Sequence, residues 1–286
     1  MSEPRERADK ALVARGFFES RAAARAAIEA GLVVANGAKV TKPSQMLAFD
    51  ADIQASPAHP YVSRGGLKLA HALPVFKVDP AGRYCIDLGA STGGFSDVLL
   101  QAGAAHVTAI DVGRDQFHHK LRGDGRVRVF EGTDVRHLSR AHILSRASLL
   151  VTDLSFIALE KALGTALDLA AQGTDLVGLF KPQFQVGRKF VGRGGIVSDV
   201  AATERAKEHF EKWLEQVGWP IRGWTASPIA GGTGIRSTYS TPANFKTWSY
   251  LWIHSPPGLN WQYSIGSFII RPSGKFVVRL MFWQMG

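Results

Sequence analysis

Cysteine is nearly absent from this sequence, since one occurs among 286 residues. A lone cysteine excludes an internal disulfide framework, and with the histidines scattered along the chain it argues against a structural zinc site, so we expect no bound metal. Long hydrophobic runs are also absent, and none approaches the roughly 18 residues that a membrane-spanning helix needs. The N-terminus, MSEPRER, has no apolar core typical of a signal peptide. We therefore expect a cytoplasmic protein with no membrane partner.

Acidic residues are outnumbered by basic ones, 24 against 34, which gives a net charge of +10 and a sequence pI near 9.9. This charge suits a polyanionic partner such as RNA, or an anionic membrane surface, and charge alone does not choose between them. The length and the 45% hydrophobic content suffice for one full-sized domain and one small one.

The most informative stretch is a glycine-rich loop that joins an apolar strand to a helix. Residues 84–95 read YCIDLGASTGGF, and residues 97–102 continue with helical character. A second apolar run at 107–111 follows at the spacing of a parallel crossover unit and ends on Asp111. This order predicts an α/β domain with a mostly parallel sheet and a nucleoside-binding site at the loop.

The charges around this loop favour S-adenosylmethionine over a dinucleotide as the cofactor. Asp87, at the mouth of the loop, would repel a pyrophosphate. S-adenosylmethionine offers an ammonium group, a sulfonium and a ribose diol, which Asp87 and Asp111 would attract or hydrogen-bond. The alternative is a structural strand, turn and helix with no cofactor. The residues expected at the cofactor are Asp87, Gly89, Ala90, Ser91, Gly93, Gly94, Phe95, Asp111, Val112 and Asp134, the last near the adenine amino group.

Two later apolar strands each deliver a charged residue to one edge of the predicted sheet. Residues 149–157 carry Asp153, and residues 176–184 carry Lys181. Ligands bind at the carboxyl ends of strands in open α/β sheets, so the two side chains indicate one shared site. The sequence also predicts a strand at 126–130 and helices at 159–171 and 200–217.

The N-terminal segment predicts a small unit of two helices and a hairpin. The helices span residues 8–15 and 21–30, with Ser20 as a cap before the second, and the hairpin turns at Asn36-Gly37. The basic residues of this unit would by default form a solvated face. However, residues 7–12 (RADKAL), 28–37 (IEAGLVVANG) and 42–44 (KPS) resemble an S4 domain, a module that grips folded RNA. The resemblance implies RNA binding by Arg7, Arg15, Ser20, Arg21, Arg25, Lys39 and Lys42, and Arg64 adds a cation beyond the unit.

Five motifs together resemble the TlyA-type, or haemolysin A, family; they are YVSRGGLK at 61–68, DLGASTGGF at 87–95, DLSFI at 153–157, KPQF at 181–184 and GGIV at 194–197. Members pair an S4 domain with an FtsJ-like, Rossmann-like methyltransferase domain and methylate cytidine ribose 2′-hydroxyls in ribosomal RNA of the ribosomal subunits. The resemblance implies S-adenosylmethionine as cofactor, ribosomal RNA as partner and no protein partner. It implies an S4-like domain at 1–58, a linker at 59–64 and a methyltransferase domain at 65–235, followed by an anomalous tail at 236–286.

The family's catalytic set is Lys, Asp, Lys and Glu, and three of its members correspond to Lys68, Asp153 and Lys181. A ribose 2′-hydroxyl is a weak acid, so it must be aligned with the methyl group and lose its proton as the new bond forms. A lysine can accept that proton only if its pKa is lowered, which burial and a second lysine achieve. We predict that Lys181 is the base or the group that orients the hydroxyl, and that Lys68 and Asp153 set its protonation and position.

The resemblance stops near Gly232. The family continues with a Gly-Asn-x-Glu motif and a closing apolar strand, whereas residues 233–242 read TGIRSTYSTP, so the fourth catalytic residue is absent. Codons exist for residues 232–242 that in another reading frame encode Asn-Gly-Asn-Pro-Glu, with the glutamate at position 237. We hypothesise a frameshift near Gly232 that replaces the last strands with an unselected tail and calls sheet closure and catalysis into question.

Two other functions stay open at this point. One is an RNA-binding protein of the same fold that no longer catalyses, because the glutamate is missing. The other is a membrane-active cytolysin, suggested by the family's older name, the positive charge and the aromatic tail. The sequence has no long amphipathic basic helix that would support the cytolysin.

Overall fold

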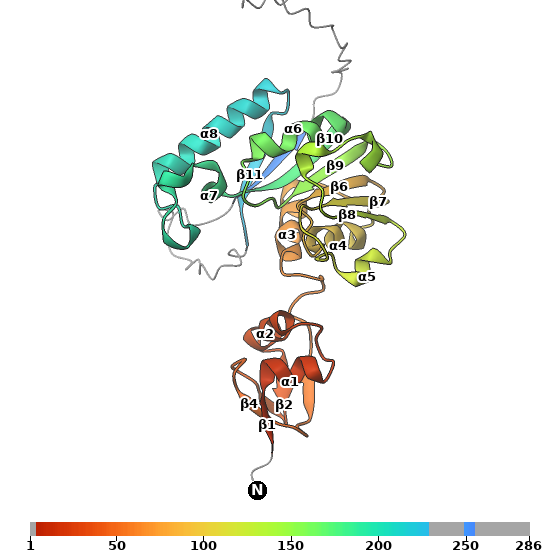
Figure 1. Cartoon of the computed structure of the whole chain (residues 1–286), viewed down its shortest axis with the longest axis vertical. Helices are drawn as coiled ribbons and strands as arrows, with labels where there is room; N and C mark the ends of the chain where they lie inside the picture. Colours follow the sequence, from red (N-terminus) through yellow and green to blue (C-terminus); the bar gives the residue numbers. More distant parts are fainter. Residues whose placement is uncertain (1–3, 229–248, 255–286) are drawn as a thin grey trace, which may run out of the picture.

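The computed structural model describes residues 4–228 and 249–254, which form a small N-terminal unit and a larger α/β unit joined by an extended segment (Figure 1). Among the helices it describes, none is both long and apolar enough to cross a bilayer. The domain boundaries at 58 and 235 stay predictions.

The N-terminal unit contains two helices and two small antiparallel sheets. Ser20 accepts a hydrogen bond from the Ala23 backbone at the start of the second helix (3.2 Å), and the hairpin turns through Asn36 and Gly37 with φ of 49° and 74°. Both predicted helices and the hairpin are confirmed. The elements are β1 (Arg5–Arg7), α1 (Ala8–Ala14), α2 (Arg21–Glu29), β2 (Val33–Ala35), β3 (Ala38–Lys39), β4 (Met46–Ala48) and β5 (Ile53–Ala55).

Three strands of this unit, β1, β4 and β5, were not predicted from the sequence. β1 pairs with β4, and β5 joins β2 and β3 in a three-stranded sheet. Each has three residues, which is too short for an alternating pattern to be recognised. β5 also lies in a stretch whose polar and proline-rich surroundings resemble a linker.

The α/β unit is built from alternating strands and helices. Its elements are α3 (Gly66–Phe76), β6 (Tyr84–Leu88), α4 (Gly94–Gln101), β7 (His106–Ile110), α5 (His119–Arg122), β8 (Val127–Phe130), η1 (Val135–His137), η2 (Arg140–His142), β9 (Ala147–Thr152), α6 (Leu159–Leu169), β10 (Ala170–Phe180), α7 (Pro182–Gln185), η3 (Arg188–Phe190), η4 (Arg193–Gly195), α8 (Val200–Gln216), β11 (Ile221–Ala226) and β12 (Ser249–His254).

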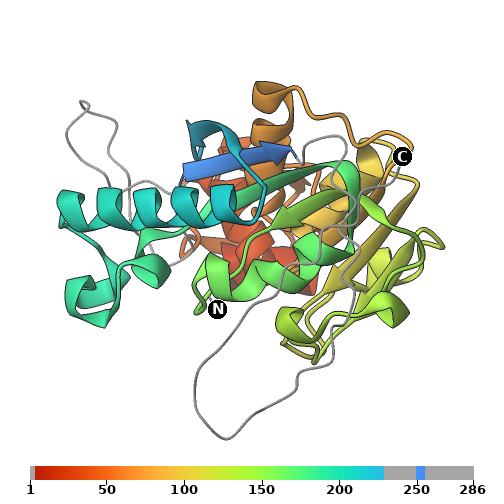
Figure 2. The same cartoon turned by 90° about the horizontal axis from the view of Figure 1, so that it is seen from above.

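One seven-stranded sheet runs through this unit in the order β11-β12-β10-β9-β6-β7-β8. The five strands from β10 to β8 are parallel, and β12 runs antiparallel to both of its neighbours. Helices cover both faces (Figures 1 and 2). Leu69 of α3 and Leu99 of α4 belong to one buried cluster, while Leu163 of α6 and Phe210 of α8 belong to the other. The predicted α/β class with a mostly parallel sheet is therefore confirmed, and the carboxyl ends of β6, β7, β9 and β10 meet at one edge.

Strand β12 lies in the stretch 236–286, which was predicted to be an anomalous tail. It occupies an interior position between β10 and β11, and its Leu251 is fully buried. The sheet is therefore closed by residues 249–254 of this chain. The rest of that stretch, including position 237, lies outside the described residues, and the frameshift stays a hypothesis.

Candidate active site

Two lysines and one aspartate meet at the carboxyl-terminal edge of the sheet. Lys68 comes from the first turn of α3, Asp153 directly follows β9, and Lys181 directly follows β10. Lys68 Nζ lies 2.8 Å from Asp153 Oδ2, and Lys181 Nζ lies 2.6 Å from Asp153 Oδ1. Both ammonium groups are buried, with Lys68 7% and Lys181 4% exposed. The predicted catalytic residues are thus in direct contact, although they lie far apart in the sequence.

Lys181 also donates hydrogen bonds to the Asp153 carbonyl (2.9 Å) and to the Ser155 hydroxyl (2.8 Å). Burial lowers the pKa of Lys181 below its usual 10.5, the negative charge of Asp153 opposes that shift, and the positive charge of Lys68 adds to it. A lysine with a lowered pKa loses its proton more readily, and its neutral amine can then accept one.

The loop after β6 is tightly turned by residues in the left-handed region. Gly89, Ser91 and Gly93 have φ of 82°, 47° and 90°. Ser91 is held there because its backbone N–H donates to Asp111 Oδ2 (2.8 Å). The loop therefore leads into α4 in the manner of a nucleotide-binding turn.

Asp87 lies beneath this loop and is completely buried. Its Oδ2 accepts a hydrogen bond from Ser96 (2.7 Å), whereas no described residue hydrogen-bonds its Oδ1. Burial raises the pKa of Asp87 to about 7, the Ser96 hydrogen bond opposes the rise, and the charges of Asp153 and Asp111 add to it. A buried carboxylate oxygen without a donor fits the ammonium group of S-adenosylmethionine.

Two glycines bring Lys68 to the cofactor loop. Gly66 begins α3 and Gly94 begins α4. A Cβ added to Gly94 would lie 2.9 Å from the Gly66 nitrogen, and a Cβ added to Gly66 would lie 3.0 Å from the Gly94 carbonyl oxygen. The two helix starts can touch only because neither residue has a side chain. The linker is attached to the first turn of α4 as well, because the Val62 backbone N–H donates to Asp97 Oδ2 (2.7 Å).

A pocket of about 270 Å³ opens between the cofactor loop and the lysine cluster. Eight of the predicted residues line it, namely Lys68, Gly89, Ala90, Ser91, Gly94, Phe95, Asp153 and Lys181. Four lining residues were not predicted, namely Ser63, Gly65, Thr92 and Ser155. All four lie in motifs that carry the family resemblance, and this position was the available signal: Ser63 and Gly65 in YVSRGGLK, Thr92 in DLGASTGGF and Ser155 in DLSFI.

Five predicted cofactor residues lie outside the pocket lining. Asp87 is buried beneath the loop, and Gly93 packs against Phe117 and Leu121. Asp111 accepts hydrogen bonds from the backbone N–H groups of Ser91 in the loop and of Gly113 (N to Oδ1, 2.6 Å), and Val112 is exposed. Asp134 caps η1 and pairs with Arg136, whose hydrogen bond lowers the pKa of Asp134 to about 2. Their contact with a cofactor stays a prediction.

An aromatic pair, of which Phe156 is exposed and Phe184 is half-buried, flanks the pocket. Phe156 follows the pocket residue Ser155, is 91% exposed and has φ of 65°, a conformation that costs a non-glycine residue energy. Its ring lies 5.1 Å from the ring of Phe184. Aromatic faces presented in this way suit the stacking of unpaired bases.

The predicted RNA-binding residues are distributed over the N-terminal unit and its exit. Arg15, Ser20, Arg21, Arg25, Lys39, Lys42 and Arg64 are exposed, and Arg7 is partly buried. Ser20 is already engaged as the cap of α2, and Arg15 donates to the Ala51 carbonyl (2.7 Å).

One buried carboxylate orients two of these arginines. Asp9 is fully buried, its Oδ1 accepts from Arg7 Nε (3.0 Å), and its Oδ2 accepts from Arg21 Nη2 (2.6 Å). The hydrogen bonds from Arg7 and Arg21 lower the pKa of Asp9 below its usual range. Asp9 therefore holds two guanidinium groups side by side at the surface, an arrangement that suits phosphate groups.

Comparisons with known proteins match both units of the chain. The FtsJ-like methyltransferase family matches residues 61–239, and the S4 domain matches residues 6–53. A 16S/23S rRNA (cytidine-2′-O)-methyltransferase TlyA from Mycobacterium tuberculosis is 42% identical over 80% of this chain and 87% of the relative. A putative rRNA methyltransferase YqxC from Bacillus subtilis is 40% identical over 82% of this chain and 84% of the relative. The solved structure of a putative hemolysin from Streptococcus thermophilus is 35% identical, with a TM-score of 0.66 over 90% of both chains.

Proposed function

The chain belongs to the TlyA family of S4-domain, FtsJ-like methyltransferases, and from this premise we propose that it methylates the ribose 2′-hydroxyl of cytidines in ribosomal RNA, with S-adenosylmethionine as the donor. We further propose that the substrate is RNA assembled in ribosomal subunits and that the reaction takes place in the cytoplasm. The observation that carries the proposal is the buried cluster of Lys68, Asp153 and Lys181 beside the cofactor loop.

The cluster supports an enzyme over an RNA-binding protein that has lost catalysis. A binding protein has no need for two buried lysines on one carboxylate, because burying charged groups costs free energy. Phosphate binding alone is served by the exposed cations of the N-terminal unit.

The chemical roles follow from the contacts. When bound, S-adenosylmethionine supplies an electrophilic methyl group on a sulfonium. Asp87, with one oxygen lacking a donor, and the backbone of residues 89–94 would hold the cofactor. Lys181 orients the 2′-hydroxyl and accepts its proton, while Asp153 fixes the position of Lys181. Burial lowers the pKa of Lys181, and the charge of Lys68 adds to that shift. Phe156 and Phe184 offer a stacking surface for a base removed from its helix.

The direct test is transfer of a labelled methyl group to purified small and large ribosomal subunits that lack 2′-O-methylcytidine. We expect label in RNA only, at a cytidine ribose, and only when this chain and S-adenosylmethionine are both present. A second chain, with residues from 233 onward replaced by the alternative-frame sequence, tests the missing glutamate. Equal transfer by both chains would show that the glutamate is dispensable, and no transfer by either chain would contradict the proposed function.

The affinity for S-adenosylmethionine should depend on the ionisation of Asp87. The pKa of this side chain is raised to about 7, and only its charged form attracts the cofactor ammonium. We expect the dissociation constant to be constant above pH 8 and to rise toward tenfold per pH unit below about pH 6, since a proton must then leave on binding. Isothermal titration between pH 5.5 and 8.5 measures this. In Asp87→Asn the binding should be weaker by roughly 10- to 100-fold and flat with pH; a wild-type curve without slope would exclude Asp87 as the ammonium partner.

A further inference from the structure

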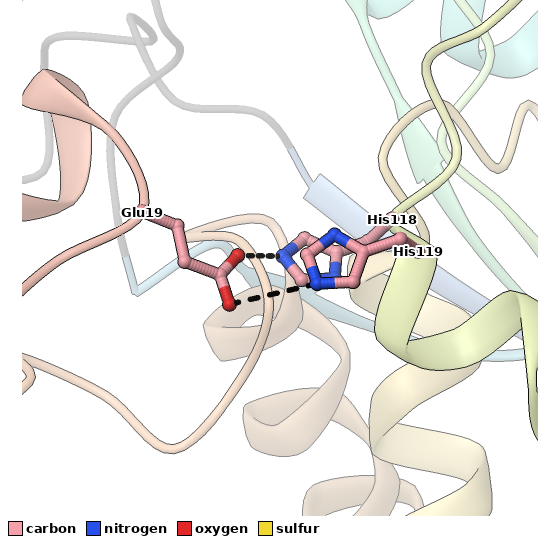
Figure 3. Close-up of side chains that lie close together, drawn as sticks. All are labelled: Glu19, His118 and His119. Carbon is pink, nitrogen blue, oxygen red and sulfur yellow. Dashed lines mark hydrogen bonds and ion pairs between the residues drawn. The ribbon is translucent and has the colours of Figure 1, made fainter. Parts of the chain in front are cut away.

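One acidic side chain links the RNA-binding unit to the methyltransferase unit. Glu19 lies directly before Ser20 and Arg21, at the start of α2, on a surface where a carboxylate would repel phosphate. Its Oε2 lies 2.6 Å from Nε2 of His118, which directly precedes α5 (Figure 3). His118 is 20% exposed in its side chain, so this contact is partly shielded from water.

The surrounding hydrogen bonds fix the direction of this contact. The Lys120 backbone N–H donates to His118 Nδ1 (3.3 Å), so Nδ1 carries no proton and Nε2–H points at Glu19. His119 stacks on His118 with ring centroids 4.6 Å apart, and its Nε2 lies 3.9 Å from Glu19 Oε1. These three side chains could also surround a metal ion. A metal on Nε2 would move the proton to Nδ1, opposite the Lys120 N–H, so the geometry favours a hydrogen bond over a metal site.

His118 is in turn attached to the cofactor loop. Its backbone N–H donates to the carbonyl of Thr92 (3.2 Å), which lines the pocket. The residues around it pack on the same loop, since a Cβ added to Gly93 would lie 2.9 Å from the Phe117 ring and 2.7 Å from Leu121. A displacement of His118 would therefore also displace the cofactor loop.

Glu19 is equally close to the RNA-binding surface. It is separated by one residue from Arg21, whose guanidinium is fixed by the buried Asp9 (2.6 Å). Glu19 and His118 therefore connect the segment that carries this arginine to the cofactor loop.

We propose that Glu19 and His118 are positioning residues that set the orientation of the RNA-binding unit relative to the methyl-transfer site, and so determine which nucleotide reaches Lys181. The contact itself is independent of the proposed function, whereas its effect on nucleotide choice rests on it. This role requires only that the distance between the phosphate-binding arginines and the methyl-transfer site stay fixed. A small misplacement of the ribose hydroxyl relative to the methyl group lowers the transfer rate strongly.

The contact is tested first without catalysis. In the full chain, the pair Glu19→Cys and His118→Cys is treated with a short bismaleimide, and the intramolecular cross-link is measured by mass spectrometry. Cys85 is buried, and burial raises the pKa of its thiol to about 12, so it does not compete. The matched control replaces the exposed Lys10 of α1 together with His118. We expect cross-linking at least fivefold faster for the first pair; equal rates would overturn the proposed contact. A zinc titration that saturates at one equivalent and is abolished in His119→Ala would overturn it in favour of a metal site.

The functional effect is tested on ribosomal subunits with Glu19→Ala, His118→Phe and the double variant. We expect kcat to fall roughly tenfold and label to spread to other nucleotides, while the affinities for subunits and S-adenosylmethionine change less than about threefold. The double variant should be no worse than either single one, because both remove the same hydrogen bond. Glu19→Gln keeps an acceptor and should retain the wild-type site. Additive losses, or unchanged kcat and site choice, would overturn the positioning role. If the wild-type chain transfers no methyl group, the proposed function is contradicted. The cross-linking experiment still tests whether Glu19 and His118 are in contact.

Discussion

Lys181→Met is expected to lower kcat for methyl transfer by about 1,000-fold, within the range that a positioned general base contributes. Methionine has a similar length and no charge, so it removes the ammonium group that lies 2.6 Å from Asp153. Asp153 keeps its ion pair with Lys68 (2.8 Å), which limits the structural damage. The rate is measured with labelled S-adenosylmethionine and ribosomal subunits, and the affinity for the cofactor, measured by titration, should change less than about threefold.

Two further variants separate a base from a structural cation. Lys181→Arg keeps the charge, but its pKa above roughly 12 prevents proton acceptance, so it should be nearly as slow as Lys181→Met. Lys161→Met changes an exposed lysine of α6 and should be fully active. Because burial lowers the pKa of Lys181, the wild-type rate should rise with pH and level off below pH 10.5. An arginine variant with near-normal kcat would show that Lys181 acts through its charge alone.

Gly94→Ala is expected to destabilise the protein by about 3 kcal/mol or more and to abolish cofactor binding. The added methyl group would lie 2.9 Å from the backbone nitrogen of Gly66, so α3 and α4 would have to separate. Separation would withdraw Lys68 from Asp153 and open the pocket wall. Thermal unfolding measures the first effect, and titration with S-adenosylmethionine measures the second.

The matched control is Gly164→Ala in the middle of α6. A Cβ at Gly164 meets no atom within 4 Å, so alanine should stabilise the protein by roughly 0.5–1 kcal/mol through helix propensity. Opposite signs for the two variants are the expected result. A Gly94→Ala protein that unfolds at the wild-type temperature and binds cofactor would contradict the close crossing of the two helices.

The sequence was most informative where a strand ends in a charged residue. Asp153 and Lys181 each follow an apolar strand, and parallel strands bring their carboxyl ends together, so their meeting could be foreseen. Lys68 could not be placed in this way. It lies on a helix, and its approach depends on the contact between Gly66 and Gly94, which no local pattern encodes. Only the family resemblance identified it.

Charge explains why some predicted residues have other partners. Asp134 and Arg136 are two positions apart, and their ion pair competes with any ligand of Asp134. Asp9 was missed for the converse reason, because a buried acid inside a helix has no distinguishing pattern until its arginines are placed around it. The contact between Glu19 and His118 spans the two units and left no trace in either sequence pattern.

The position of β12 has a consequence for synthesis of the chain. β10 and β11 are translated before β12, and β12 must then insert between them, antiparallel to both. Until residues 249–254 leave the ribosome, the backbone amides and carbonyls of β10 on that side lack their final partner, which is a condition that promotes aggregation. Lys181, which directly follows β10, therefore reaches its final environment only after residues 249–254 have been synthesised.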